Sequence, residues 1–481
     1  MADTAFALPL ALPPPGTRER ARSLHEQLKA AMLDGRLPPG ARLPSTRALA
    51  ASLGVSRNTV IAVYDRLLAD GYISAAGADG TRVAALLPQR PAAARQRQTP
   101  AAAETRLAAF WRDAAFPAHG VGPAPALDFR LGQPDWRQLP FDIWTRLAAR
   151  SARTLARGGA GYADAAGLPA LRAAIAGHAA FTRAVACGPD DVIVTGGAQQ
   201  AFDLLARVLV APGRSVVALE DPGYPPLRAA FQAQGAVLAG VPVDAEGLVV
   251  ERLPADARVV CVTPSHQFPL GVAMSARRRA ELLAWARAHG ACIVEDDYDG
   301  EFRYGGRALD ALQTLDGGDA VFYVGTFSKS LFPSLRLGYV VAPAWAAAAL
   351  QAAKRIADLH ADVAAQQTLA DFIGEGHLAR HVRKMRRLYD ARRQALLAAL
   401  ARHGGARLQP VQAWAGLHVS ALWAAGPVPK GLVERAAARG IGVETLERYA
   451  WAGAAQRGLA FSFALVEAGQ IDAAVAALFR P

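Results

Sequence analysis

The stretch YVGTFSKSLFPSLRLGY, residues Tyr323 to Tyr339, places Lys329 in a loop of small residues, directly after an apolar run that is typical of a buried strand. Arg336 follows it seven residues later. A lysine held beside a phosphate-bearing aldehyde can condense with it through the side-chain amine. A single lysine is more commonly a solvated surface charge, so the meaning of Lys329 depends on the segments around it.

Two further segments place polar groups where predicted strands end. IVTGGAQQA, Ile193 to Ala201, predicts a strand, two glycines and the start of a helix, whose free amides can hold a phosphate. IVEDDYDGEFRY covers Ile293 to Tyr304 and ends a strand with two carboxylates. These are Asp296 and Asp297, followed by Tyr298, and such strand ends are where α/β proteins bind ligands. Each segment alone also fits a plainer structure, a tight connection or a solvated turn.

A third segment, LEDPGYPPL at Leu219 to Leu227, ends another strand and offers Tyr224, whose ring can cover a flat ligand or fill the core. Beyond Ala126, apolar strand-like runs alternate with helices rich in Ala, Leu and Arg. This alternation predicts an α/β domain with a largely parallel sheet. The clearest predicted strands are Val192 to Thr195, Val216 to Leu219, Val259 to Thr263, Cys292 to Glu295 and Val321 to Val324.

The chain before this domain divides in two. Between Leu87 and Ala126 it is rich in Pro, Ala, Gln and Arg with no lasting period, which predicts a linker. We therefore expect a first domain at residues 1–85, a linker at 86–125 and the α/β domain at 126–481. In the first domain, Ser45 can cap a helix that stops at Gly54, and Ser56 can cap a second helix.

The second helix, which ends at Gly71, predicts a DNA-binding motif. Its buried face is expected to hold Val60, Val63, Tyr64, Leu67 and Leu68. Two short helices joined in this way form a helix-turn-helix pattern, whose polar first turn, Arg57 to Thr59, can read DNA. Residues 72–74 and 81–84 flank the turn Gly77 to Gly80 and predict a two-stranded wing. The pattern alone also fits a helical hairpin with a solvated polar face.

The string GRLPPGARLPSTRALAASLGVSRNTVIAVYDRLLADGYI, Gly35 to Ile73, closely resembles the winged helix-turn-helix domain of GntR-type bacterial transcription regulators. The resemblance implies that DNA is contacted by Arg47, Ser56, Arg57, Asn58 and Thr59. An arginine here suits a guanine edge or a phosphate. Ile61 departs from the pattern, because some members carry a basic residue at this position.

The segments around Lys329 together resemble the fold type I aminotransferases, whose cofactor is pyridoxal phosphate, over roughly Asp128 to Phe479. The implied fold joins a mostly parallel α/β sheet domain to a smaller α/β domain. The resemblance implies that Lys329 binds the cofactor aldehyde and that Asp296 keeps the pyridine nitrogen protonated. It also implies that Tyr298 bonds to the ring hydroxyl and that Tyr224 stacks on the ring.

The same resemblance implies how the phosphate is held and how subunits assemble. It assigns the phosphate to Gly197, Ala198, Gln199, Thr326 and Arg336. Tyr162, in GYADAAGLPALR, matches the tyrosine that reaches the phosphate of the partner subunit in these enzymes. We therefore expect a homodimer with shared sites, and the linker permits a domain-swapped one.

One departure from the enzymes points to a regulator. In TPSHQFPLG, Thr263 to Gly271, Phe268 stands where the enzymes have asparagine, so the ring hydroxyl loses one donor. The phrase is instead similar to that of MocR-type regulators, the GntR subfamily that joins a winged helix through a long linker to an aminotransferase-like domain. DFRLGQPDWRQLPFDIW, Asp128 to Trp144, also resembles that subfamily. We expect a regulator that binds operator DNA, with an effector site in place of an active enzyme.

A second departure concerns the effector. Aminotransferases bind the substrate carboxylate through an arginine just before a late strand, which GLAFSFALV, Gly458 to Val466, resembles. Alignment puts Ala460 at the position of that arginine, and Arg457 is out of register. An α-amino acid would therefore lack its bidentate clamp. We expect the effector to be pyridoxal phosphate itself or an amine bound in another way.

Two other functions remain open at this stage. A complete cofactor set also fits a working aminotransferase, or one with a residual half-reaction, that carries a DNA-binding domain. Steady production of keto acid would identify it. A purely structural cofactor site is the third possibility, and it predicts DNA binding that is indifferent to pyridoxal phosphate.

Composition adds limits of its own. The net charge of +12 suits nucleic acid, but Arg-rich and Ala-rich chains are often basic without binding any. Three widely spaced cysteines form no metal-binding or redox pair. No stretch reaches the roughly 18 strongly apolar residues of a membrane span, and the Asp-bearing, Pro-broken start is unlike a secretory signal. We expect a cytoplasmic protein with no membrane partner.

Overall fold

The computed structural model describes residues 8–14, 19–75, 80–85, 106–112, 125–158, 160–305, 310–424, 429–453 and 456–480. The chain forms two compact units, Met1–Arg106 and Leu107–Pro481, which are considered separately below. Most of the predicted linker lies outside the described residues. Its described part contains the short helix α4 (Ala109–Arg112).

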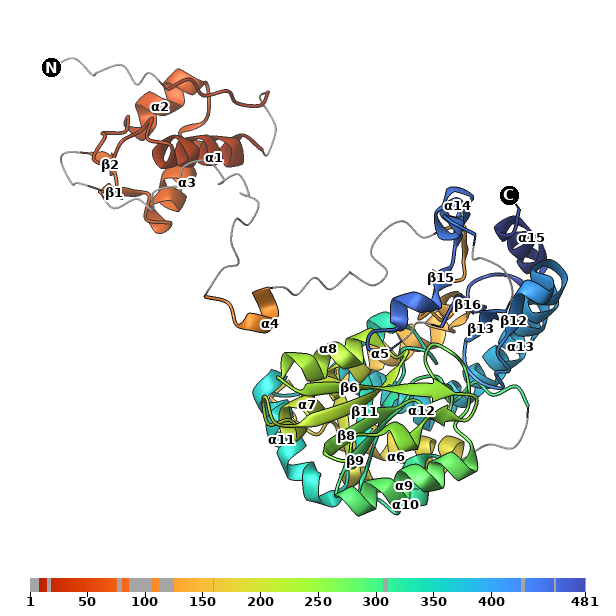
Figure 1. The fold of residues 1–481 in the computed structure, drawn as a ribbon. Coiled ribbons are helices and arrows are strands. Elements are labelled where there is room, and N and C mark those ends of the chain that lie inside the picture. The colour runs from red at the N-terminus through yellow and green to blue at the C-terminus, as the bar shows by residue number, and fades with distance from the viewer. Residues whose placement is uncertain are drawn as a thin grey trace. The chain divides into compact units, whose positions relative to one another are not determined.

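The first unit is a winged helix-turn-helix (Figure 1). Its elements are α1 (Glu19–Leu33), α2 (Thr46–Leu53), α3 (Arg57–Ala69), β1 (Ile73–Ala75) and β2 (Thr81–Val83). The two strands pair antiparallel, as predicted for the wing. Residues 77–79 of the predicted wing turn, Gly77 to Gly80, lie outside the described residues.

The predicted helix caps are confirmed. Ser45 Oγ accepts a hydrogen bond of 3.2 Å from the Ala48 amide, and Ser56 Oγ accepts one of 3.1 Å from Thr59. Gly54 ends α2 in the left-handed region with φ +58°, where glycine carries no steric penalty. These caps set the sharp turn between α2 and α3.

The buried face of α3 matches the prediction except at one position. Val60, Val63, Tyr64 and Leu67 are buried against α1 and the wing, but Leu68 is 47% exposed, so its predicted burial is wrong. Residues 60, 63, 64 and 67 follow the helical repeat along one stripe. Leu68 lies one residue, or about 100° of rotation, beyond Leu67 and leaves that stripe.

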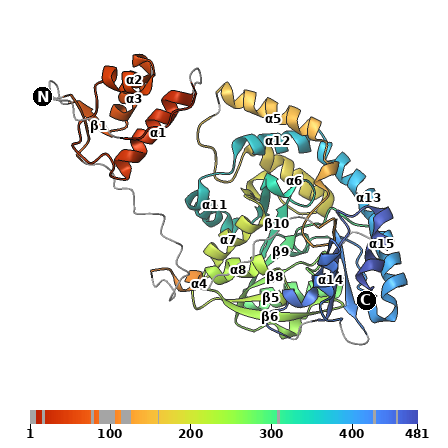
Figure 2. The same ribbon diagram turned by 90° about the horizontal axis from the view of Figure 1, so that it is seen from above.

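The second unit is built on an eight-stranded sheet with the order β4-β11-β10-β9-β8-β5-β6-β7. The strands are β4 (Val192–Thr195), β5 (Val216–Asp221), β6 (Val237–Asp244), β7 (Gly247–Leu248), β8 (Ala257–Val262), β9 (Cys292–Asp297), β10 (Val321–Thr326) and β11 (Gly338–Val341). Figure 2 shows the five central strands, β10-β9-β8-β5-β6, which pair in parallel. The predicted α/β domain with a largely parallel sheet is confirmed.

Helices cover both faces of this sheet. Val217 and Leu219 of β5 pack on the side of α7 (Ala198–Leu209), α8 (Pro225–Ala233) and α11 (Ala344–Asp358). Ala218 between them packs on the side of α9 (Ala276–His289) and α10 (Leu312–Asp316). Successive strand side chains point to opposite faces, so a sheet buried on both sides is apolar at consecutive positions. The helices of this unit beyond α4 are α5 (Phe141–Ala156), α6 (Pro169–Arg183), α7 (Ala198–Leu209), α8 (Pro225–Ala233), α9 (Ala276–His289), α10 (Leu312–Asp316), α11 (Ala344–Asp358), α12 (Val363–Gly374), α13 (His377–Gly404), α14 (Leu432–Ala438) and α15 (Ala468–Leu478).

A smaller lobe completes the second unit. It contains an antiparallel sheet in the order β12-β13-β16-β15 and a two-stranded parallel pair, β14-β3. Its strands are β3 (Leu127–Asp128), β12 (Leu408–Pro410), β13 (His418–Trp423), β14 (Ile441–Gly442), β15 (Glu444–Thr445) and β16 (Gly458–Ser462). Helices α13 and α15 pack against each other beside this lobe.

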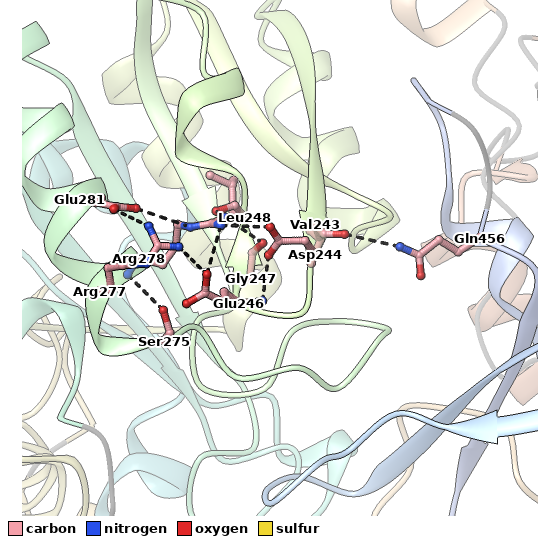
Figure 3. Close-up of polar contacts among 10 residues, drawn as sticks. All are labelled: Val243, Asp244, Glu246, Gly247, Leu248, Ser275, Arg277, Arg278, Glu281 and Gln456. Carbon is pink, nitrogen blue, oxygen red and sulfur yellow. Dashed lines mark hydrogen bonds and ion pairs between the residues drawn. The ribbon is translucent and has the colours of Figure 1, made fainter.

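The carboxylate of Asp221, at the end of β5, joins the two lobes. It accepts hydrogen bonds from the amides of Trp451, Ala452 and Gly453 at 2.9, 3.1 and 2.5 Å. A second contact runs from Gln456 Nε2 to the Val243 carbonyl oxygen at 3.4 Å (Figure 3). The smaller lobe is thus attached at the ends of β5 and β6.

The strand that receives Gln456 is braced by a buried arginine at the start of α9 (Figure 3). Arg278 forms an ion pair of 3.0 Å with Asp244 of β6 and donates a 2.6 Å hydrogen bond to the Leu248 carbonyl oxygen. Ser275 caps the same helix through the Arg278 amide.

Among the described helices, none has the length and apolar character needed to cross a membrane.

Candidate functional site

The carboxyl ends of β9 and β10 bring Asp296 and the loop that carries Lys329 to one edge of the sheet. The two strands are parallel neighbours, and Asp296 is paired in register with Val324. Both strands run two residues further than predicted, so Asp296 and Asp297 are the last residues of β9. Lys329 follows β10 by three residues, and the negative charge of Asp296 acts to raise the pKa of its amine.

The two adjacent acids differ in one respect: among the described residues, Asp297 forms an ion pair and Asp296 forms none. Asp297 accepts hydrogen bonds from the buried Arg183 at 2.5 Å and from Tyr323 Oη at 2.6 Å. Oδ1 of Asp296 and Oδ1 of Asp297 are both buried without a hydrogen-bond partner among the described residues, so the difference between the two acids is the ion pair of Asp297. Burial, together with the charges of Asp297 and Asp299, raises the pKa of Asp296 well above its ordinary value, and Lys329 opposes this. A cationic group placed beside Asp296 would relieve that cost.

The Lys329 amine is held at the site by one backbone contact. Its Nζ donates a hydrogen bond of 2.6 Å to the Gly132 carbonyl oxygen. Burial lowers the pKa of Lys329, an effect that Arg336 increases and the carboxylates of Asp299 and Asp296 oppose. A lowered pKa provides more of the neutral amine, which is the form that attacks a carbonyl.

The start of α7 and Arg336 form a cradle for an anion. Gly197 precedes the helix with φ +84°, and a Cβ at this position would lie 3.0 Å from the Arg336 guanidinium nitrogens. Arg336 Nη2 donates a 2.6 Å hydrogen bond to the Gly196 carbonyl oxygen. The first amides of a helix have no partner within it, and those of Ala198 and Gln199 belong to this set.

Two other groups predicted for the phosphate have partners in this structure. Thr326, the last residue of β10, donates a 3.1 Å hydrogen bond from Oγ1 to Ser328 Oγ. The side-chain amide of Gln199 donates a 3.0 Å hydrogen bond to the Pro226 carbonyl oxygen. Only the backbone amide of Gln199 therefore remains for an anion at the helix start. Gly338 pairs with both Thr326 and Thr195, which places the end of β10 beside the β4–α7 turn.

Three aromatic rings meet on the same side of the sheet edge. The ring of Phe268 lies 5.2 Å from that of Tyr224 and 6.0 Å from that of Tyr298. Burial raises the pKa of Tyr224 to about 12. Tyr298 Oη donates a 3.0 Å hydrogen bond to the His266 carbonyl oxygen. Phe268 thus fills the place between the two predicted ring ligands with an apolar side chain.

In the single chain, Tyr162 lies apart from the other residues predicted to bind the cofactor. Its side chain is 88% exposed, and its ring contacts His360 at 6.0 Å. Within one chain it makes no recorded contact with Lys329 or Arg336 among the described residues.

At the position of the missing arginine, Ala460 of β16 is fully buried. It belongs to an apolar cluster with Val243, Leu270 and Leu446, and Leu131 packs against it. Arg457 is exposed before the same strand. The residues paired with Ala460 in the sheet are Ser420 of β13 and Glu444 of β15.

Sequence reasoning missed several residues that shape the site. Glu220, at the end of β5, is buried and accepts a 2.6 Å hydrogen bond from Thr263 Oγ1. His266 and Asp299 contact each other at 3.0 Å next to Tyr298. All of them fall inside the segments singled out above, so their position beside Tyr224, Phe268 and Asp296 was the available signal.

In the first unit, the predicted DNA-contacting residues lie at the start of α2 and α3. Arg47, Ser56, Arg57 and Asn58 are exposed, and Thr59 is half-buried. The hydroxyls of Ser56 and Thr59 are bonded to each other at 2.8 Å. Arg57 and Asn58 thus present their side chains on the first turn of α3.

The residues of the larger site fit a phosphorylated aldehyde with a protonated ring nitrogen. Lys329 supplies the amine, Tyr224 supplies a flat ring, and Asp296 supplies a buried carboxylate oxygen that has no hydrogen-bond partner within the described ranges. The Gly197 turn and Arg336 supply a cradle for the phosphate, which any side chain at residue 197 would fill. Pyridoxal phosphate has all of these complementary groups.

Two family models match the chain. Residues 127–435 match aminotransferase class I and II, and residues 20–83 match bacterial regulatory proteins of the gntR family.

Individual proteins match over most of the length. The chain is 38% identical to the probable rhizopine catabolism regulatory protein MocR of Rhizobium meliloti, over 93% of this chain and 90% of that one. It is 35% identical to the pyridoxine biosynthesis transcriptional regulator PdxR of Corynebacterium glutamicum, over 95% and 94%. Among solved structures, LysN, an α-aminoadipate aminotransferase of Thermus thermophilus complexed with N-(5'-phosphopyridoxyl)-L-leucine, is similar with a TM-score of 0.67 and 30% identity, over 74% of this chain and 91% of that one.

Proposed function

This chain belongs to the MocR-type regulators of the GntR family, and from that membership we propose that pyridoxal phosphate at Lys329 controls how the winged helix holds operator DNA. The observation that carries the proposal is the buried carboxylate of Asp296, whose Oδ1 has no hydrogen-bond partner in the part of the chain that the structure describes and which interacts with the charge of Lys329. When bound, pyridoxal phosphate supplies an aldehyde that condenses with amines and a ring that withdraws electrons.

The roles proposed for individual residues follow from their geometry. Lys329 binds the aldehyde, Asp296 holds a proton on the ring nitrogen, and Tyr224 covers one face of the ring. Tyr298 donates to the ring hydroxyl. The phosphate is held by Arg336, Thr326, the turn at Gly197, and the first amides of α7 at Ala198 and Gln199.

We propose a homodimer, with Tyr162 reaching the partner's site. In support, three large apolar or aromatic side chains of the second unit lie in solvent in the single chain: Tyr162 is 88%, Phe181 89% and Ile356 82% exposed. Exposed apolar groups of this size favour a protein interface. The domain division proposed is 1–85, 86–125 and 126–481, with a linker that permits domain swapping. Size-exclusion chromatography with light scattering tests the dimer, and a monomer at micromolar concentration would contradict it.

The proposed effector is pyridoxal phosphate itself or an amine without a clamped carboxylate, and the protein is proposed to act in the cytoplasm as a sensor. Phe268 removes a polar contact from the ring, and Ala460 lies in an aliphatic cluster in place of a carboxylate-binding arginine. Turnover needs an oriented substrate as well as an electron sink. Titration with common amino acids should leave the spectrum of the bound cofactor unchanged at micromolar concentration. A rapid change with one of them would refute this part.

A working aminotransferase is the second candidate, because residues proposed to hold the aldehyde, the ring nitrogen and the phosphate are all present in the chain. The deciding experiment is an absorbance scan of the purified protein with and without pyridoxal phosphate. It is followed by a gel shift, under both conditions, on DNA from upstream of the protein's own reading frame. A visible band together with a cofactor-dependent gel shift supports the regulator. Steady release of keto acid with an unchanged gel shift supports the enzyme.

A further inference from the structure

A buried histidine lies directly behind Tyr298. His266 Nδ1 is 2.9 Å from Tyr298 Oη, and the His266 carbonyl oxygen accepts a 3.0 Å hydrogen bond from the same hydroxyl. The two rings lie 5.9 Å apart. One residue therefore contacts the hydroxyl of Tyr298 through both its side chain and its backbone.

Asp299 determines which nitrogen of His266 carries the proton. Its Oδ2 lies 3.0 Å from His266 Nδ1 and accepts a second hydrogen bond of 3.2 Å from the Leu417 amide. An ionised carboxylate only accepts hydrogen bonds, so Nδ1 must carry a proton. The single Nδ1–H is then shared between Asp299 Oδ2 at 3.0 Å and Tyr298 Oη at 2.9 Å, and toward Nδ1 the Tyr298 hydroxyl acts as the acceptor. The hydroxyl proton of Tyr298 is left to donate elsewhere, which in this structure is the His266 carbonyl oxygen.

The space around this pair is shaped to hold it. His266 and Asp299 are both 1% exposed. Gly416 has φ +81°, and a Cβ there would lie 2.0 Å from His266 Nδ1 and 2.5 Å from Asp299 Oδ2. No other residue fits at position 416 without moving the pair. The only other histidine packed on His266 among the described residues is His418, which bonds to the Pro269 carbonyl oxygen at 2.9 Å.

We propose that His266 is a positioning residue for Tyr298, with Asp299 holding the Nδ1–H form of the ring. A donor to Tyr298 Oη makes the hydroxyl a stronger donor in turn, because hydrogen bonds in a chain polarise one another. The ring oxygen of a bound cofactor then competes with the His266 carbonyl oxygen for the hydroxyl proton. This inference rests on the proposed function, in which Tyr298 donates to that ring oxygen.

Other charged groups act on the same place and set the background of any pH titration. Burial raises the pKa of Tyr298, and the carboxylates of Asp299, Asp296, Glu220 and Asp297 add to the effect. Burial lowers the pKa of Lys329, the charges of Asp299 and Asp296 act to raise it, and Arg336 acts to lower it. Substitution of an acid would change this background, so the test below leaves the acids in place.

The test uses full-length protein loaded with pyridoxal phosphate and measures the pH midpoint of its visible absorbance. A donor to the ring oxygen stabilises the anionic form, so Tyr298→Phe should raise the midpoint by about one to two pH units. His266→Gln, whose amide reaches the position of Nε2, should raise it in the same direction by a smaller amount. His266→Asn places an amide near Nδ1 and should restore the wild-type midpoint.

His381→Asn is the control, because His381 is also a buried histidine and, among the described residues, it has no hydrogen bond or ring contact with His266 or Tyr298. It should leave the midpoint unchanged. The inference is overturned if His266→Gln moves the midpoint no more than His381→Asn while Tyr298→Phe moves it. It is also overturned if Tyr298→Phe has no effect. Failure of the wild-type protein to develop a visible band would instead overturn the proposed function. If His266→Gln does not fold, a midpoint of His266→Asn equal to that of Tyr298→Phe overturns the inference, and a wild-type midpoint supports it.

Discussion

Asp296 and Asp297 are neighbours in β9, yet among the described residues only Asp297 has an ion-pair partner, the buried Arg183 at 2.5 Å. Their side chains leave the strand on opposite faces, because strand residues alternate. Oδ1 of each acid is buried without a hydrogen-bond partner in the described part of the chain. The Asp297 ion pair holds α6 to the sheet, whereas the Asp296 carboxylate interacts with the charge of Lys329.

The two acids should respond differently to removal of their charge. Asp297→Asn leaves Arg183 buried without its partner and should lower the free energy of unfolding by about 3–5 kcal/mol. Asp296→Asn should leave the unfolding free energy of the cofactor-free protein equal or higher, and weaken pyridoxal phosphate about 10- to 100-fold. Denaturant unfolding and a cofactor titration measure both. Equal effects of the two variants on cofactor affinity would remove Asp296 from the proposed role.

Lys329→Ala should abolish the visible absorbance of the bound cofactor and the cofactor-dependent change in DNA binding. The fold should remain, since the Lys329 side chain makes a single recorded hydrogen bond, to the Gly132 carbonyl oxygen. Absorbance spectra and circular dichroism check the two statements. A persistent visible band would mean that another amine binds the aldehyde. Lys354→Ala is unsuitable as a control because that lysine is fully buried and paired with Asp358, whereas the exposed Lys384 is suitable.

Glu220 should make stability depend on pH. Burial raises its pKa from the ordinary 4.5 to about 7, against the hydrogen bonds from Thr263 and Gln267. Between these values the folded protein keeps a proton that the unfolded chain releases. The stabilisation is complete below pH 4.5 and is lost as the pH rises through 7.

Glu220→Gln removes this titration. Relative to the wild type, the variant should gain stability as the pH rises from about 5 to about 8, by at most ~3 kcal/mol. Thermal unfolding across this pH range measures the gain, and Glu251→Gln on the surface serves as the control. A difference that stays constant with pH would show that Glu220 is ionised throughout.

Arg57→Ala should weaken specific DNA binding by about 1–3 kcal/mol if the side chain reads a base edge. Arg57 is exposed on the first turn of α3, where a recognition helix meets the major groove. Arg66 lies exposed in the last turn of the same helix and provides a control of equal charge. A gel shift at fixed salt compares them, and equal losses would indicate a general electrostatic effect in place of base reading.

Local patterns in the sequence were sufficient for the modules and most of their elements. Ser45, Gly54 and Ser56 mark helix ends because caps depend on residues within one turn. Apolar runs mark the central strands because each must be buried on both faces. The strand-end positions of Lys329, Asp296 and Tyr224 follow from these same patterns.

Contacts between residues far apart in the chain required the packed structure. Which of the two adjacent acids forms an ion pair depends on Arg183, which is 114 residues away from Asp297. The partner of Tyr298 is His266, which comes from the loop after a neighbouring strand. Leu68 remains exposed because none of the described elements covers its side of α3, and the cluster around Ala460 assembles side chains from both lobes. A local pattern states which side chains are present, whereas the burial and partner of each depend on which elements the fold brings together.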